Sequence, residues 1–161
     1  MRVLGIDPGS RRTGWGIVQL EGTRLRPIGA GTIAIPEKLA LPKRLRIIHQ
    51  ELQHIVSEHQ PEVVAVEEIF FAKYANAALK LGHARGVALL VAAELELEVH
   101  EYPPAIVKRT IVGRGGADKI QVGRLVTALL GLSTPPKEDA ADALAVAITH
   151  IQATRSRAIA R

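Results

Sequence analysis

The first third of the chain alternates apolar runs with short polar breaks, which is typical of β-strands joined by tight turns. Apolar and β-branched residues dominate the segments 2–6, 14–20 and 25–35. The break at 21–23 contains a glycine and predicts a hairpin turn. We therefore expect three antiparallel strands in this part of the chain.

The middle of the chain changes to helical spacing. From 41 to 59, Leu, Ile and Val recur every three or four residues, and Pro42 suits a first helical turn. Pro61 ends this helix, and the unbroken apolar run 63–66 predicts a strand buried on both faces, near the centre of the sheet. A last strand is expected at 97–102.

The segment 75–94 predicts a long helix that is apolar around much of its circumference. One face of a sheet cannot cover so much apolar surface. Such a helix lies either in the core of a larger domain, which this chain lacks, or against a second copy. We therefore expect a homodimer formed through this helix.

Prolines and glycines divide the last third of the chain into short segments. We expect a short helix at 106–112, a Gly-rich loop at 113–116 and a helix at 118–130. After two more prolines, a final helix is expected from 137 to about 152, followed by a short basic tail at about 153–161. No repeat or linker is present, so the prediction is one α/β domain spanning 1–161.

The amino-acid composition narrows the range of possible functions. None of the 161 residues is cysteine, which excludes disulfides, thiolate zinc sites and a cysteine nucleophile. The N-terminal apolar run is too short for a signal peptide, and the longest later run is too short to span a membrane, so we expect a cytoplasmic protein. The formal net charge of +5 favours a polyanionic partner, although a solvated basic surface would give the same value.

Four carboxylates in three separate segments are the main chemical signal. Asp7 and Glu67 each end an apolar strand, and Asp139 and Asp142 lie three apart at the start of a helix, on one face. Ends of strands and starts of helices are where α/β active sites form. Because clustered carboxylates repel each other, the four acids predict a site for divalent cations.

Other interpretations of Asp7 exist. An Asp-Pro-Gly sequence also forms ordinary turns, and an Asp-x-Gly hairpin grips phosphate in actin-like and sugar-kinase proteins. The latter class needs a second such motif, and none occurs in this chain.

Basic and aromatic residues predict contacts with a nucleic acid. Five cations cluster around the Gly-rich loop, where they can hold phosphates or simply face solvent: Lys108, Arg109, Arg114, Lys119 and Arg124. Either Phe70 or Phe71 can stack on an unpaired base, and we also expect Lys73 to contact DNA. The six histidines show no metal-ligand spacing and are expected on the surface.

Four stretches carry a resemblance to a known family. In order and spacing, GIDPGSRRTGWG, AVEEIFFAKYANAALKLGHARG, VKRTIVGRGGADKIQV and DAADALAVAITH resemble blocks of the RuvC family of bacterial Holliday junction resolvases, within the ribonuclease H-like superfamily. The resemblance implies a five-stranded mixed sheet, three N-terminal strands antiparallel plus two parallel, flanked by α-helices. It also implies a dimer whose two sites nick opposing strands of a four-way DNA junction, in association with a RuvA–RuvB complex.

The resemblance assigns roles to individual residues. The four acids would hold Mg²⁺, with Mn²⁺ as a substitute, while Lys108 and Lys119 would be the family's basic residues and Phe70 its loop aromatic. The hypothesis is phosphodiester hydrolysis by two ions about 4 Å apart, giving 5′-phosphate and 3′-hydroxyl ends. Asp7 is the candidate bridging ligand, and Lys119 would neutralise charge on the phosphate.

Three rival functions stay open at this point. A ribonuclease H-like enzyme acting on RNA–DNA hybrids would use the same acids. A non-catalytic junction-binding module would bind without nicking, and an actin-like ATPase would bind nucleotide. The motifs also leave open which nucleotide sequence a resolvase of this type would cut.

Overall fold

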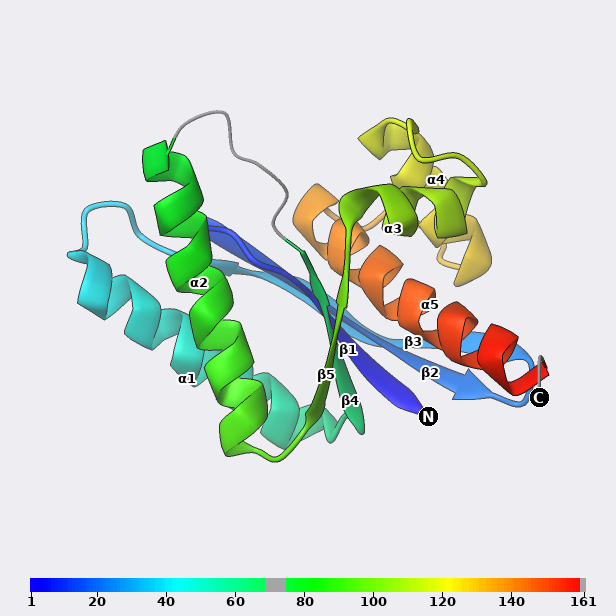
Figure 1. Ribbon diagram of the computed structural model, residues 1–161, viewed down its shortest axis with the longest axis horizontal. Helices are drawn as coiled ribbons and strands as arrows, with labels where there is room; N and C mark the ends of the chain where they lie inside the picture. Colours follow the sequence, from blue (N-terminus) through cyan, green and yellow to red (C-terminus); the bar gives the residue numbers. More distant parts are fainter. Residues whose placement is uncertain (69–74, 160–161) are drawn as a thin grey trace.

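A five-stranded mixed sheet forms the centre of the protein, seen in a computed structural model that describes residues 1–68 and 75–159 (Figure 1). The strand order is β3-β2-β1-β4-β5. The strands are β1 (Arg2–Asp7), β2 (Arg12–Glu21), β3 (Arg24–Ala34), β4 (Val63–Glu67) and β5 (Glu98–Tyr102). The first three pair antiparallel, whereas β1–β4 and β4–β5 pair parallel, which confirms the predicted sheet. The middle strand is β1, and β4 lies beside it.

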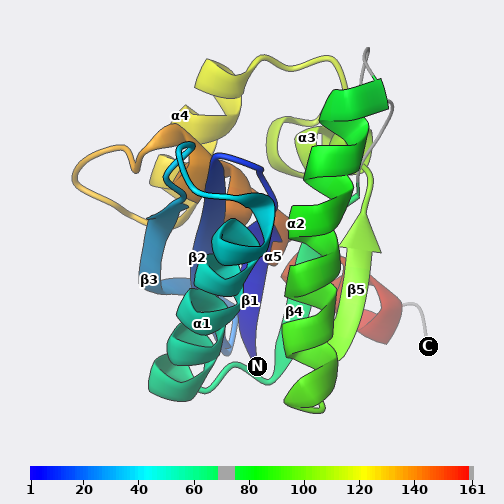
Figure 2. The same ribbon diagram turned by 90° about the vertical axis from the view of Figure 1, so that its left-hand side faces the viewer.

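Helices cover both faces of the sheet. The helices are α1 (Leu41–His59), α2 (Ala75–Glu94), α3 (Pro104–Val112), α4 (Lys119–Leu129) and α5 (Glu138–Ile159). The first two pack on one face and the last three on the other, so the molecule has three layers (Figures 1 and 2). Within the described ranges, no helix combines the length and apolar character needed to cross a bilayer.

Alternation along the strands decides which side chains meet each helical layer. In β1, Val3 belongs to the core beneath α3, α4 and α5, whereas Leu4 and Ile6 belong to the core beneath α1 and α2. Because side chains alternate along a strand, Asp7 shares the face of Val3. In β4, Ala65 lies in the same core as Val3, so Glu67 also faces the α3–α5 layer.

The helix α5 lies unusually close to the sheet because glycines face it. A Cβ atom on Gly5 would lie 2.0 Å from the carbonyl oxygen of Ala143, and one on Gly14 would lie 2.0 Å from that of Asp139. These are backbone atoms that cannot rotate away, so only glycine permits the contact. The backbone of α5 therefore rests directly on β1 and β2.

The last helix is longer than expected. The prediction ended it near residue 152, followed by a tail, but α5 continues to Ile159. Residues 153–159 contain no glycine or proline and are rich in Ala and Arg, which favour helix. The predicted tail is thus mostly helical, and residues 160–161 lie outside the described part of the chain.

One histidine contradicts the prediction that all six lie on the surface. His150 is only 5% exposed. Its Nδ1 is hydrogen-bonded to the Tyr102 hydroxyl at 2.9 Å, and its ring lies 4.4 Å from that of His100, measured between centroids. A polar ring with a hydrogen-bond partner is compatible with burial, and burial lowers the pKa of His150 to about 4.

Replacing Gly5 tests the close packing of α5. Gly5→Ala forces a methyl group against the α5 backbone and should lower the free energy of unfolding by about 1 to 3 kcal/mol. Urea unfolding followed by circular dichroism measures the change. A Cβ atom on Gly116 meets nothing within 4 Å, so Gly116→Ala is the control. Equal urea midpoints for the two variants would contradict the packing argument.

Candidate active site

Three of the four predicted acids line one small cavity, which we term the acid cavity. Its volume is about 200 Å³. Asp7 comes from the end of β1, Glu67 from the end of β4 and Asp142 from the second turn of α5. Lys108 of α3 and Lys119 at the start of α4 complete its polar lining. The site thus joins residues from five different elements.

Strand register and helix packing bring these acids together. In the parallel pair β1–β4, Ile6 lies opposite Val66, so the following residues Asp7 and Glu67 leave neighbouring strands at the same edge. The start of α5 is held over this edge because its backbone rests on Gly14, which pairs with Asp7 across β1 and β2. One helical turn further, Asp142 enters the cavity.

Burial and neighbouring negative charges raise the pKa values of all three carboxyl groups. Burial, followed by the charges of Glu67 and Asp142, raises the pKa of Asp7 to about 8. Burial is also the main cause that raises the pKa values of Glu67 and Asp142. Without a cation, Asp7 is therefore protonated near neutral pH, and a hydrogen bond joins its carboxyl group to that of Glu67.

A lysine ammonium group compensates part of the remaining negative charge. Lys119 Nζ lies 3.0 Å from Asp142 Oδ2 and 2.8 Å from Glu138 Oε1. These two hydrogen bonds raise the pKa of Lys119, while the pKa of Glu138 is lowered by the same contact. Glu138 was not among the residues that the sequence predicts for the site. Its place directly before Asp139 was the one available signal for this pairing.

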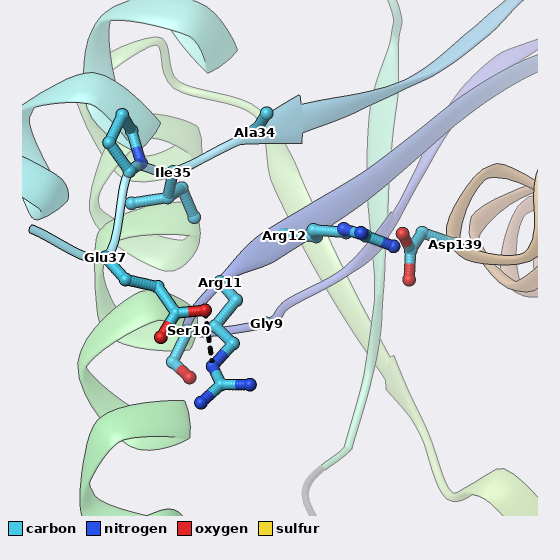
Figure 3. Close-up of a pocket in the computed structure, with 9 residues that line it drawn as sticks. Gly9, Ser10, Arg11, Arg12, Ala34, Ile35, Glu37 and Asp139 are labelled. Atoms are coloured by element: carbon cyan, nitrogen blue, oxygen red, sulfur yellow. Dashed lines mark ion pairs between the residues drawn. The ribbon is translucent and has the colours of Figure 1, made fainter.

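The fourth acid lies apart from the other three. Asp139 lines a neighbouring cavity of about 770 Å³ with the segment 9–12, and its carboxylate and the Arg12 guanidinium point toward each other (Figure 3). In the same cavity, Arg11 Nε pairs with Glu37 Oε1 at 3.1 Å. Within residues 1–68 and 75–159, no three carboxylate or imidazole groups are already arranged to hold a metal ion.

The predicted DNA-binding residues fall into three groups. Lys108 and Lys119 line the acid cavity, where their charges offset part of the rise that burial causes in the pKa of Glu67. Arg114 is exposed on the Gly-rich loop, where its Nη2 donates a hydrogen bond of 3.0 Å to Gln121 Oε1. Phe70 and Lys73 lie outside the described residues, as does Phe71.

Comparison with known proteins gives consistent matches. Residues 3–150 match the family model described as "Crossover junction endodeoxyribonuclease RuvC". A protein of that name from Sorangium cellulosum (strain So ce56) is 54% identical over 153 residues, which cover 95% of this chain and 86% of the relative.

Solved structures agree with the sequence matches. Thermus thermophilus RuvC superposes with a TM-score of 0.89 at 36% identity, covering 97% of this chain and 96% of that one. The same protein "in complex with Holliday junction substrate" superposes with a TM-score of 0.92 at 35% identity and equal coverage. The ribonuclease H-like fold predicted from the sequence is confirmed by these matches.

The raised pKa of Asp7 predicts a pH-dependent stability. The native metal-free protein keeps a proton that unfolded Asp7 releases near pH 4, so Asp7 contributes stability at low pH that is lost as pH rises to about 8. The loss should reach up to about 1.4 kcal/mol per pH unit. His150, whose pKa is lowered, acts in the opposite sense below about pH 6.5.

Denaturant unfolding in EDTA between pH 6.5 and 8, compared between the wild type and Asp7→Asn, therefore measures the effect of Asp7. The wild type should lose stability across this interval, and Asp7→Asn, which has no proton to release, should lose much less. Parallel pH profiles of the two proteins would show that Asp7 ionises normally.

Proposed function

The chain belongs to the RuvC family of crossover junction endodeoxyribonucleases, and we propose that its acid cavity is the centre that cuts four-way DNA junctions. The protein is a DNA endonuclease of the Holliday junction resolvase type, which acts in recombination and repair. Residues 1–161 would act as one nuclease domain. One observation carries the assignment of the centre: Asp7, Glu67 and Asp142, from three distant segments, meet in one cavity with raised pKa values.

The donor set fits Mg²⁺ ions. Hard oxygen ligands are those that Mg²⁺ prefers, and Mn²⁺ accepts the same set. Burial of the charged forms is the main cause of the three raised pKa values, and this cost falls when positive charge enters the cavity. Asp7, Glu67 and Asp142 would hold the ions, and Asp7, which is affected by the charges of both other acids, is the candidate for a shared ligand. Asp139, one turn before Asp142 on α5, would join them by turning from Arg12.

The reaction is hydrolysis of one phosphodiester bond in each of two opposing strands. Bound Mg²⁺ ions supply an activated water and charge stabilisation for the leaving 3′ oxygen. Asp7 would have to give up its proton in order to act as a ligand. Lys108 and Lys119 at the cavity wall bind the scissile phosphate. The products carry 5′-phosphate and 3′-hydroxyl ends.

Lys119 would change partners during this cycle. In the metal-free protein its ammonium group pairs with Asp142 and Glu138. When cations bind Asp142, Lys119 is free to turn to the phosphate and neutralise the charge that develops there. Arg114, Phe70 and Lys73 would extend the DNA contact beyond the cavity.

A homodimer would supply the second active site. Along the outer side of α2, Leu79 is 63% exposed and Leu90 is 52% exposed. Between them, Cβ atoms on Gly82 and Gly86 would meet nothing within 4 Å. Small residues between leucines let a second helix approach closely, and a two-fold axis would give two sites for two strands.

The cellular setting follows from the substrate. The matched relatives are bacterial, and bacterial junction DNA lies in the cytoplasm, where a RuvA–RuvB branch-migration complex would present the junction to the enzyme.

Asp7→Asn is the direct test of the centre. With Mg²⁺ and a mobile four-way junction whose strands are end-labelled in turn, the wild type should give symmetric, ligatable nicks in two opposing strands. Asp7→Asn should lower the rate by roughly 100-fold or more, because a buried ligand charge is lost. Junction binding, measured by gel shift without Mg²⁺, should remain because Lys108 and Arg114 are intact.

An acid outside the cavity provides the control for this experiment. Glu51 is exposed on α1, and Glu51→Gln should cut like the wild type. Normal nicking by Asp7→Asn would refute the assignment of the centre. If the wild type cuts an RNA–DNA hybrid in preference to a four-way junction when both are present, the proposed substrate is wrong.

A charged residue on the outer side of α2 tests the dimer. Leu90→Glu should reduce the mass in solution from two chains to one, because the glutamate would be buried without a partner. Light scattering at several protein concentrations measures this mass. Leu129 is 44% exposed on α4, so Leu129→Glu is the matched control and should remain dimeric. If the mass of Leu90→Glu is unchanged, the dimer contact does not involve this side of α2.

A further inference from the structure

A second cavity, largely apolar, adjoins the acid cavity. It has a volume of about 290 Å³ and lies between α4 and the approach to α5. Its apolar lining consists of Ile120, Gly123, Pro135, Pro136 and Ala141. The segment that joins α4 to α5 stands out from the body of the protein in Figure 2. We term this space the apolar cavity.

The apolar cavity is open to an external ligand. Ile120 is 68% exposed although it is a large aliphatic side chain on the first turn of α4. A Cβ atom on Gly123 would meet nothing within 4 Å, so the protein itself leaves this wall unfilled. The volume is near the lower limit of small-molecule pockets, which hold about 300 Å³ or more. One group of moderate size therefore suits this space.

The two cavities share a border. Lys119 and Asp142 line both of them, and the 3.0 Å contact between Lys119 Nζ and Asp142 Oδ2 is the boundary. A ligand held in the acid cavity by a phosphate therefore has its adjacent chemical group beside the apolar cavity. In a DNA strand the group next to a phosphate, across one sugar, is a base.

Charge around the apolar cavity also suits a nucleotide. Arg124 is exposed and lines it, which provides a cation for a phosphate next to the scissile one. The Glu138 carboxylate lines it as well and can accept hydrogen bonds from base amino groups. The apolar walls can contact a base face, while these two groups discriminate its edge.

We propose that the apolar cavity receives one nucleobase of the cleaved strand, next to the scissile phosphate, and thereby sets the nucleotide sequence that the enzyme cuts. This inference rests on the proposed function of the acid cavity. At the centre of a four-way junction the bases are at the ends of their stacks, so moving one out of the duplex is least costly there. The occupant is a base of the substrate and not a second protein.

Filling the apolar cavity is the test. Gly123→Leu places a side chain in the open space, and leucine favours helix more than glycine does, so the fold should persist. On a pool of junctions with varied crossover sequences and Mg²⁺, the wild type should cut a subset of sequences. Gly123→Leu should cut these sites roughly tenfold or more slowly and lose the preference among them.

Two further variants distinguish an effect on the apolar cavity from a general effect on helix α4. Ala128 is exposed on α4 and does not line the cavity, so Ala128→Leu should keep the wild-type rate and preference. Ile120→Ala removes an apolar wall and should weaken the preference in the same direction as Gly123→Leu. Melting temperatures of all variants show whether each one is folded. Wild-type rates and preference in folded Gly123→Leu would overturn the inference.

A binding measurement without Mg²⁺ tests the base contact when no cutting takes place. With 2-aminopurine at positions flanking the crossover, wild-type protein should raise the emission at one position, because a base that leaves its stack fluoresces more strongly. Gly123→Leu should bind the junction without this rise. An equal rise in both proteins, or none in the wild type, would refute the inference. Absence of nicking by the wild type would instead refute the proposed function.

Discussion

The contact between the α5 backbone and the glycines of the central strands is the constraint on which the rest of the structure depends. Gly5 and Gly14 leave no space for a side chain where the carbonyl oxygens of α5 approach. This contact fixes the height and position of α5 over the edge where β1 and β4 end. Packing therefore places Asp142 in one cavity with Asp7 and Glu67. Under the proposed function, the position of the metal centre would be a consequence of how the core is filled.

That packing buries three carboxyl groups close together, which is electrostatically unfavourable. The protein offsets this cost in two ways. A proton stays on Asp7, whose pKa is raised to about 8, and the ammonium group of Lys119 pairs with Asp142. Both positive charges can be replaced by another cation, because the proton can dissociate from Asp7 and the Lys119 side chain can rotate away from Asp142. The cavity therefore keeps its shape while the source of its positive charge changes. Under the proposed function, a site that accepts cations and a phosphate in turn would benefit from such exchangeable partners.

Much of this arrangement could be predicted from the sequence, for identifiable reasons. The apolar run before Glu67 and the strand before Asp7 both signal buried strands, so the two acids could be placed at strand ends. The separation of Asp139 from the other acids could not be predicted, because it depends on which way its side chain turns beside Arg12. The burial of His150 was also missed, since its partner Tyr102 is distant in the sequence. The length of α5 was underestimated because no glycine or proline marks its end.

The ion pair between Lys119 and Asp142 has a thermodynamic consequence. Under the proposed function, Mg²⁺ and the ammonium group compete for one carboxylate, and a DNA phosphate competes for the ammonium group. Occupancy of the centre by Mg²⁺ and by DNA is then linked: each raises the affinity for the other by the same factor, as reciprocity between binding free energies requires. One flexible side chain would make the enzyme respond cooperatively to its two charged ligands, and so restrain cutting when only one of them is present.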